Sequence, residues 1–429
     1  MHLIRRQTCR VCGSRALTRV IDLGMQHLQG SFVKSGKRPP PMRTIPCTLV
    51  RCDPALDERA CGLLQMEHTV PPEVLYSSYW YRSGTNRTMR DHLAGIAREA
   101  VAMTGLAKGI ALDIGCNDGT LLDAYPATAR RIGIDPADLA IEAAAKFEVV
   151  RDLFPSPELH ALLGTDRCDI VTSIAMFYDL EDPVTFCSDV AQALAPDGLW
   201  IFEMSYMPSM LELTSYDTIC HEHLEYYSLA VIEGILSRAG LKLVRGELNP
   251  INGGSLRCYA TLKTCGKYRN DAWLQQIAEL RKKEFDLELD TDKPYKNFQN
   301  RINVHRERLV KFLKDLKAAG KKIHVYGAST KGNTILQWCG IDHRLVDCAA
   351  DRNPEKHGAH TIGTDIPIVS EEESRALRPD YYLVLPWHFR EEFLDRERTT
   401  MQNGTALIFP LPEIRVYKYE KGDVKVEML

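Results

Sequence analysis

The feature that most constrains the fold is a short apolar segment that runs into a glycine-containing loop. Residues 109–114 are predicted to form a strand, and Gly115 and Gly119 follow in the loop, where glycine lets the backbone approach a ligand closely. The apolar residues that come next predict a helix. A strand, a glycine loop and a helix in this order form the ligand loop of a doubly wound parallel sheet, so we expect an α/β domain here.

The spacing of this loop indicates the kind of ligand. Asp113-x-Gly115-x-x-x-Gly119 differs from the Gly-x-Gly-x-x-Gly pattern that seats a dinucleotide pyrophosphate. A carboxylate before the loop suits a ligand with an amino-acid end, such as S-adenosylmethionine. A second predicted strand ends in Asp135, 20 residues after Gly115, where an acid can accept hydrogen bonds from ribose hydroxyls. The predicted cofactor-binding residues are Asp113, Gly115, Asn117, Gly119, Asp135 and Pro136.

Two further strand patterns, at residues 168–174 and 199–203, complete the expected sheet. Loop, acid and strands in this order predict a class I methyltransferase fold. The alternative is a similar α/β sheet that binds no ligand.

A second strand-loop-helix pattern follows a charged segment. Residues 271–321 predict helices with a break at Pro294, and after them come a strand at 322–326, a loop at 327–332 and a helix from Asn333. Lys331, at the start of that helix, is placed to meet a phosphate. Because the loop lacks the dinucleotide spacing, we favour a substrate-facing role. A second cofactor site, for NAD, and a structural relic of duplication are the alternatives.

Five of the 13 cysteines fall within the first 61 residues. Cys9-x-x-Cys12 is typical of the first half of a structural zinc site, and Cys52 with Cys61 is the expected second half, with Cys47 in reserve. Four thiolates about 2.3 Å from Zn²⁺ leave no open position for catalysis. Reduced cysteines scattered through the domain are the alternative.

Length and charge narrow the class of protein. The 429 residues suffice for two to three domains of roughly 150 residues each. A net charge of −3 offers no bulk cationic field for nucleic acid or acidic lipid. No apolar run approaches about 18 residues and the N-terminus lacks the apolar block of a signal peptide, so we expect a cytoplasmic protein without a membrane span.

The densest group of reactive side chains lies at residues 216–228, around His221-Glu222-His223. Histidine suits general acid–base catalysis near neutral pH, which is our interpretation. Metal chelation by the two histidines and an ordinary helix-capping surface segment are the alternatives. Farther on, a Gly253-Gly254 turn precedes Ser255 and Arg257, and the arginine is either a contact for an anionic substrate or a salt-bridged structural residue.

Seven motifs then occur in one order. They are Cys9-x-x-Cys12-Gly13, Cys61-Gly62-Leu63-Leu64-Gln65, Tyr79-Trp80-Tyr81-Arg82-Ser83-Gly84, the Asp113–Gly119 loop, His221-Glu222-His223, Gly253-Gly254-Ser255-Leu256-Arg257 and Gly327-Ala328-Ser329-Thr330-Lys331-Gly332. This order spans essentially the whole chain and resembles the three-domain nucleotide-sugar C-methyltransferases of deoxysugar biosynthesis.

The resemblance implies a zinc-binding domain at 1–88, a domain that binds S-adenosylmethionine at 89–268, and a helical connection with a Rossmann-like α/β domain at 269–429. The last domain would help to enclose a nucleoside-diphosphate sugar. It also implies that His223 acts as a base with Glu222 beside it, and that Tyr79 and Tyr81 line the sugar site.

Two residues depart from the family's pattern. Cys220 stands where a tyrosine is typical and Asp179 where a histidine is typical, and both positions are expected to face the sugar. Their replacement bears on which sugar, and which carbon, is methylated. The predicted catalytic residues are His223, Glu222, Tyr79, Tyr81 and Asp179, and the predicted substrate-binding residues are Tyr178, Cys220, Ser255, Arg257 and Lys331.

The expected reaction is methylation of a carbon next to a ketone on a nucleotide-linked deoxysugar. An O- or N-methyltransferase on the same scaffold is the first alternative, and a non-catalytic protein that retains a bound nucleotide is the second. The sequence does not indicate the oligomeric state.

Overall fold

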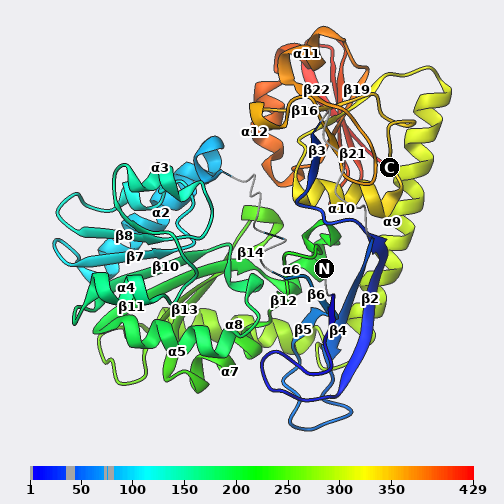
Figure 1. The fold of residues 1–429 in the computed structure, drawn as a ribbon. Helices are drawn as coiled ribbons and strands as arrows, with labels where there is room; N and C mark the ends of the chain where they lie inside the picture. Colours follow the sequence, from blue (N-terminus) through cyan, green and yellow to red (C-terminus); the bar gives the residue numbers. More distant parts are fainter. Residues whose placement is uncertain (1–2, 35–43, 72–74, 76–81) are drawn as a thin grey trace.

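A computed structural model describes residues 3–34, 44–71, 75 and 82–429 of the chain. Two seven-stranded sheets and one four-stranded sheet contain most of the strands in this part of the chain. Figure 1 shows the three sheets in three lobes, with the long helix α9 (Lys293–Ala318) running beside the N-terminal and C-terminal lobes.

The central lobe is built on a sheet with the order β13-β14-β11-β10-β7-β8-β9. All neighbours are parallel except β14, which is antiparallel to both β11 and β13. The strands are β7 (Ile110–Ile114), β8 (Arg130–Ile134), β9 (Glu148–Val150), β10 (Cys168–Ile174), β11 (Leu194–Ser205), β13 (Leu241–Asn249) and β14 (Ser255–Leu262). This order confirms the predicted class I methyltransferase fold.

Alternation along β11 explains how this sheet is covered on both faces. Leu199 and Ile201 join the core under α2 (Arg87–Thr104), whereas Trp200 and Phe202 join the core on the opposite face. Successive side chains of a strand point to opposite faces, so a strand that is apolar throughout is buried on both sides. The remaining helices of this lobe are α3 (Ala140–Ala144), α4 (Pro157–Leu163), α5 (Pro183–Ala193), α6 (Met207–Leu213) and α7 (Leu229–Arg238).

The prediction of a helix directly after the glycine loop is wrong. Only a 3₁₀ turn, η2 (Leu122–Ala124), forms there. Pro126 disfavours the helical conformation of Tyr125, which is extended with ψ of 153°, so the turn cannot continue. The predicted helices at 271–321 are confirmed as α8 (Asp271–Asp286) and α9, and Pro294 lies in the first turn of α9.

The N-terminal sheet has the order β12-β5-β4-β2 and is antiparallel. Its strands are β2 (Leu17–Gln26), β4 (Ile45–Cys52), β5 (Leu64–Met66) and β12 (Glu225–Tyr226). The last strand comes from the central part of the chain, directly after His221–Leu224. The N-terminal lobe therefore holds one end of the histidine segment by backbone pairing. A second short pair joins β1 (Ile4–Arg5) and β6 (His68–Thr69).

The C-terminal sheet has the order β18-β16-β15-β19-β20-β21-β22 and is parallel up to β20. Its strands are β15 (Ile323–Tyr326), β16 (Ala349–Asp351), β18 (Ile368–Ser370), β19 (Tyr381–Val384), β20 (Ala406–Phe409), β21 (Arg415–Glu420) and β22 (Asp423–Met428). Its helices are α10 (Thr330–Cys339), α11 (Glu371–Ala376), α12 (Arg390–Arg396) and α13 (Arg398–Gln402).

The N-terminal and C-terminal lobes share one hydrophobic core. Ile21 and Leu49 of the N-terminal sheet join the same cluster as Phe298 and Ile302 of α9 and Leu336 of α10. In addition, β3 (Phe32–Lys34) pairs with β17 (Ala359–Thr361) of the C-terminal domain. The two lobes are thus one packed unit, against which the histidine segment of the central lobe is held.

Candidate active site and metal centre

The glycine loop after β7 has the backbone conformation that its residues favour. Gly115 and Gly119 each have φ of +78°, and Asn117 has φ of +51°. A Cβ atom on Gly119 would lie 2.9 Å from the ring of Phe147, which is closer than real Cβ contacts. Glycine is therefore needed at this position both for the backbone angle and for the space.

Two buried carboxylates flank the loop. Asp113 is 3% exposed and accepts a hydrogen bond from Thr172 Oγ1 at 2.7 Å, and burial raises the pKa of its carboxyl group to about 7. Asp135 accepts hydrogen bonds from the backbone N–H groups of Asn117 at 2.9 Å and Ala137 at 2.8 Å. Each bond uses a different oxygen of Asp135, so both oxygens keep a lone pair. Pro136 follows and is exposed.

These groups fit S-adenosylmethionine. The ionised carboxylates can accept hydrogen bonds from an ammonium group and from ribose hydroxyls, and the glycines leave the loop backbone uncovered. Asp113, Gly115, Asn117, Gly119 and Asp135 would hold the cofactor, which supplies an electrophilic methyl group when it is bound.

The histidine segment lies at the same edge of the sheet as this loop. The 3₁₀ turn η3 (Phe177–Asp179) follows β10, the neighbour of β7, and Met176 lies against Gly115, where an added Cβ would be 3.3 Å from its side chain. The backbone N–H of Leu224 donates to the Tyr178 carbonyl at 2.7 Å, and the rings of Tyr178 and His223 are centred 4.1 Å apart. Tyr178 thus connects His223 to the cofactor edge.

One hydrogen bond sets the proton position on His223. Its Nδ1 lies 2.7 Å from the Thr218 carbonyl oxygen. Because a carbonyl can only accept, Nδ1 carries the proton and Nε2 carries the lone pair. Burial lowers the pKa of His223 to about 3, and the nearby ammonium of Lys331 contributes to this. The ring is therefore neutral near pH 7 and Nε2 is available as a base.

His221 points to different neighbours. Its backbone N–H and its Nδ1 lie 3.2 Å and 2.8 Å from Gln29 Oε1, so Nδ1 is a donor here as well. Burial lowers the pKa of His221 to about 4. Within residues 3–34, 44–71, 75 and 82–429, the one group of three or more Cys, His, Asp or Glu ligand atoms close enough to hold an ion consists of cysteines. The described structure therefore does not support chelation by His221 and His223.

Two acids lie around His223. Glu222 keeps part of its surface exposed, but protein atoms enclose its carboxyl group and this burial raises its pKa to about 7. Burial and then the charge of Glu222 raise the pKa of Asp179 well above its usual value, and no described residue forms a hydrogen bond with Asp179 Oδ1. Cys220, beside them in sequence, is fully buried and burial raises the pKa of its thiol. Contact between substrate and Cys220 or Asp179 stays a prediction.

Lys331 reaches the active site from the C-terminal domain. Its Nζ donates to the Asn252 carbonyl at 2.7 Å. Burial lowers the pKa of Lys331, and the carboxylate of Asp217 opposes this effect. Asp217 is 1% exposed and lies in η4 (Tyr216–Thr218), the turn that also carries the carbonyl bonded to His223. Lys331, at the start of α10, therefore lies against the segment that carries the histidines, and its contact with a phosphate stays a prediction.

Ser255 and Arg257 are held by structural partners. Ser255 Oγ donates to the Ile251 carbonyl at 2.9 Å. Arg257 Nε donates to Glu203 at 2.8 Å and its Nη1 donates to Glu247 at 3.1 Å. The side chain of Arg257 is 10% exposed and that of Glu203 is 3% exposed. This geometry favours the salt-bridged alternative for Arg257 over contact with an anionic substrate.

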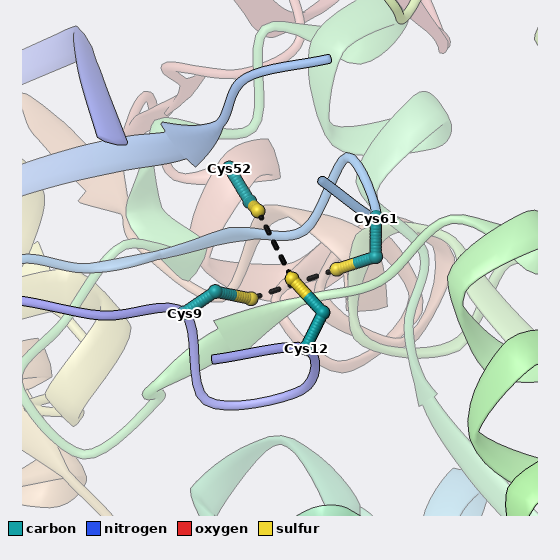
Figure 2. Close-up of side chains that lie close together, drawn as sticks. All are labelled: Cys9, Cys12, Cys52 and Cys61. Atoms are coloured by element: carbon teal, nitrogen blue, oxygen red, sulfur yellow. Dashed lines mark hydrogen bonds between the residues drawn. The ribbon is translucent and has the colours of Figure 1, made fainter. Parts of the chain in front are cut away.

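The predicted metal ligands come together (Figure 2). The sulfur atoms of Cys9, Cys12, Cys52 and Cys61 all lie within 4.8 Å of one another, with Cys9 and Cys61 at 3.5 Å and Cys12 and Cys52 at 3.4 Å. Four sulfurs around a tetrahedral Zn²⁺ lie about 3.8 Å apart, so the cluster fits the ion. The reserve ligand Cys47 lies elsewhere, near Gln29 and the Ile219 carbonyl.

Arg10, between two of these cysteines, connects the metal centre to the active site. Its guanidinium donates to the Met66 carbonyl at 2.9 Å and to Thr69 Oγ1 at 2.6 Å. Its Nε lies 3.3 Å from Glu181 and 3.8 Å from Glu225. Each of these acids is two residues from a predicted catalytic residue, Asp179 or His223. The zinc knuckle and the histidine segment are therefore packed on one buried arginine.

Comparisons with known proteins agree with this arrangement. Three family models match in succession: a zinc binding domain at residues 9–76, a methyltransferase domain at 84–245 and a C-methyltransferase C-terminal domain at 250–412. The chain is 28% identical to the C-methyltransferase NovU of Streptomyces niveus over 96% of its own length and 97% of that protein. The chain is a methyltransferase that uses S-adenosylmethionine, and it is similar to a C-methyltransferase over nearly its whole length. Its four-cysteine cluster is a structural zinc site.

Two solved structures of methyltransferases are each similar to about two fifths of this chain. An S-adenosylmethionine-dependent methyltransferase from Clostridium acetobutylicum is 12% identical, with 40% of this chain and 92% of that chain covered and a TM-score of 0.33. Magnesium protoporphyrin IX methyltransferase from Synechocystis with bound S-adenosylmethionine is 18% identical, with 41% and 79% covered and a TM-score of 0.31. Scores this low carry no argument, and the fold rests on the strand order.

The glycine loop of the C-terminal domain packs closely against the residues that follow β19. A Cβ atom on Gly327 would lie 2.6 Å from Pro386, and one on Gly332 would lie 2.7 Å from Leu385. Asp351, at the end of β16, accepts from the Ala328 N–H at 2.8 Å and lies 3.6 Å from Lys356 Nζ. Close packing therefore requires glycine at positions 327 and 332, and a second cofactor site for NAD stays an alternative.

Some residues of the site were missed or are not described. Tyr79 and Tyr81 lie outside the described residues, so their roles stay predictions. Asp217 was not singled out from the sequence, although it stands within the 216–228 cluster. Trp387, which donates to Asp217 Oδ2 at 2.9 Å, follows a predicted strand end and gave no signal of its own. Among the helices of the described part of the chain, none is long and apolar enough to cross a bilayer.

Proposed function

We propose that this methyltransferase acts on a nucleotide-linked deoxysugar and methylates a carbon next to its ketone. The observation that carries the proposal is a neutral His223 with a free Nε2 lone pair at the cofactor edge of the sheet. An oxygen or nitrogen acceptor already has a lone pair, whereas a carbon acceptor needs a proton removed first. A neutral histidine whose Nε2 carries the lone pair therefore favours methylation at carbon over methylation at oxygen or nitrogen.

The chemistry at the carbon needs a base and a stabilised oxygen. A ketone acidifies the adjacent C–H bond because the electron pair spreads onto the carbonyl oxygen. His223 Nε2 would take this proton, and the Thr218 carbonyl would stabilise the imidazolium through the hydrogen bond that it already accepts. Glu222, whose pKa is raised to about 7, precedes His223 in the chain. Its carboxyl group would accept the proton from the imidazolium or offset the positive charge of the imidazolium.

The remaining predicted residues would shape the substrate site. Tyr178, which packs on the His223 ring, would hold the imidazole at the cofactor edge. Asp179, with an unpartnered carboxylate oxygen, and Lys331 would contact polar groups of the sugar nucleotide. Tyr79 and Tyr81 would line the sugar site. Cys220 would affect how the sugar fits in that site. For Ser255 and Arg257 we propose structural roles.

The test of the base is His223→Asn. Positioned general bases contribute about 10²–10⁴-fold, so turnover with a panel of keto-deoxysugars linked to thymidine or uridine diphosphate should fall by that range. Affinity for S-adenosylmethionine, measured by calorimetry, should stay within about twofold because the cofactor loop is untouched. His160→Asn, a change on the exposed face of α4, is the matched control and should keep full activity. Near-normal turnover of His223→Asn would remove His223 from the base role.

The same panel separates carbon methylation from the alternatives. In deuterium oxide without methyl donor, the wild-type enzyme should exchange a carbon-bound hydrogen next to the ketone, which NMR detects. Methyl transfer without any such exchange, and with the new methyl group on oxygen or nitrogen, would refute methylation at carbon.

A further inference from the structure

Lys331 stands in unusual surroundings for a lysine. Its ammonium is enclosed by protein, yet no carboxylate of the described residues lies within ion-pair distance, and within that part of the chain it donates to the Asn252 carbonyl. A buried ammonium that has no ion-pair partner destabilises the folded protein through its lost hydration, unless a bound anion offsets that loss. Its side chain keeps part of its surface exposed, so a ligand can reach it.

The groups around this ammonium also have unused hydrogen-bonding capacity. Asp217 is 1% exposed, with Oδ2 bonded to Trp387 Nε1 at 2.9 Å and Oδ1 without a partner. His388 Nδ1 is likewise buried and unpartnered. The titratable groups that the ammonium influences are Asp217, Cys220, His223 and His388.

The geometry places Lys331 beside the base rather than in a remote subsite. Thr334, one turn farther along α10, donates to the Ile219 carbonyl at 3.1 Å, so this face of the helix packs on the 216–223 segment. Within that segment, Asp217 and Thr218 are consecutive, and they hold the Trp387 indole and the His223 ring respectively. The ketone oxygen is two bonds from the carbon whose proton the base removes. Because α10 packs on the segment that holds His223, the Lys331 ammonium lies in the same part of the site, where it can stabilise that oxygen.

We propose that Lys331 is a catalytic residue that stabilises the negative oxygen formed when His223 deprotonates the substrate, with Asp217 as a positioning residue that keeps the lysine protonated. This rests on the proposed function. In the step, the C–H electron pair forms a carbon–carbon double bond, the carbonyl π pair moves to oxygen, and the proton goes to His223 Nε2. The charges balance, since a new imidazolium and a new oxyanion form beside the existing ammonium and carboxylate.

The test is hydrogen–deuterium exchange at the carbon, without methyl donor, in Lys331→Met at saturating keto-sugar nucleotide. Loss of one oxyanion partner costs about 10²–10³-fold, and we expect the exchange rate to fall by that range. Affinity for thymidine diphosphate or uridine diphosphate alone should stay within about threefold. Lys331→Arg, which keeps the charge, should show an exchange rate at least tenfold higher than that of Lys331→Met. Lys317→Met, which removes a lysine paired with Asp347 at 2.7 Å outside the site, is the control.

A pH profile separates this role from a structural one. Burial lowers the pKa of His223 most and Lys331 lowers it further, so removal of the lysine should move the acidic limb of the exchange profile to higher pH while the thermal midpoint stays unchanged. Lys331→Arg, which keeps the charge, should return the limb to its wild-type position. General loosening of the fold would also hydrate His223 and raise its pKa, but it would lower the thermal midpoint as well. If Lys331→Met does not fold, Asp217→Asn decides, with an expected loss of at least tenfold in exchange and unchanged diphosphate affinity.

The outcomes that overturn the proposal are equally defined. Unchanged exchange at saturating substrate with a large loss of diphosphate affinity would make the diphosphate, not the ketone oxygen, the partner of Lys331. Unchanged exchange with unchanged affinity would leave the lysine without a role in either. A wild-type enzyme with neither exchange nor methyl transfer would refute the proposed function itself, and this assignment with it.

Discussion

Replacement of Arg257 by methionine tests the structural role that the geometry favours. The change removes the guanidinium from a buried cluster and leaves Glu203, 3% exposed at its side chain, with His92 at 2.6 Å and Asn249 at 2.9 Å as remaining partners. Removal of one partner from a buried ion pair costs about 3–5 kcal/mol because it strands a charge. Since two partners of Glu203 remain, we expect the lower end, about 3 kcal/mol.

The assay is urea denaturation near pH 7.5, read as the midpoint of the central domain's transition, because a three-domain protein does not unfold in two states. With a slope of about 3 kcal/mol/M, the midpoint should fall by about 1 M. Arg130→Met is the control, since Arg130 and Glu148 form a pair that is 31% and 44% exposed and should lose less than about 1 kcal/mol. The reasoning fails if Arg257→Met keeps its midpoint but raises KM for the sugar nucleotide tenfold or more.

Two further predictions concern the metal and the cofactor. Cys12→Ser should reduce bound zinc, measured by elemental analysis, from one ion per chain toward none. The thermal midpoint should also fall, because the ion contributes folding free energy to the N-terminal lobe. Full zinc content in the variant would contradict the ligand set. Affinity for S-adenosylmethionine should fall as pH drops below about 7, up to about tenfold per pH unit, because Asp113 with a pKa of about 7 then loses the charge that attracts the ligand's ammonium. Calorimetry from pH 5.5 to 8.5 checks this, and Asp113→Asn should bind weakly without the dependence; a flat wild-type profile would speak against a contact with Asp113.

Local sequence was sufficient where the chemistry depends on neighbours along the chain. The glycine loop, Asp135 and the strand pattern follow from backbone freedom and from the alternation of apolar residues, and Cys9-x-x-Cys12 is a turn that binds metal by its own spacing. The pairing with Cys52 and Cys61 could also be predicted, because few other thiols lie near in the chain. The helix after Gly119 was mispredicted because Pro126 ends it, a local signal that was overlooked.

Local patterns were thus enough to predict the kind of fold, the cofactor loop, the metal ligands and the candidate base. Only long-range packing established which side chains surround that base. It brought Lys331 of the C-terminal domain to the Asn252 carbonyl of the central domain and made Arg257 part of a buried ion pair. These contacts join residues that are 79 and 54 positions apart in the sequence. Their approach depends on how sheets and helices pack rather than on any pattern within one segment.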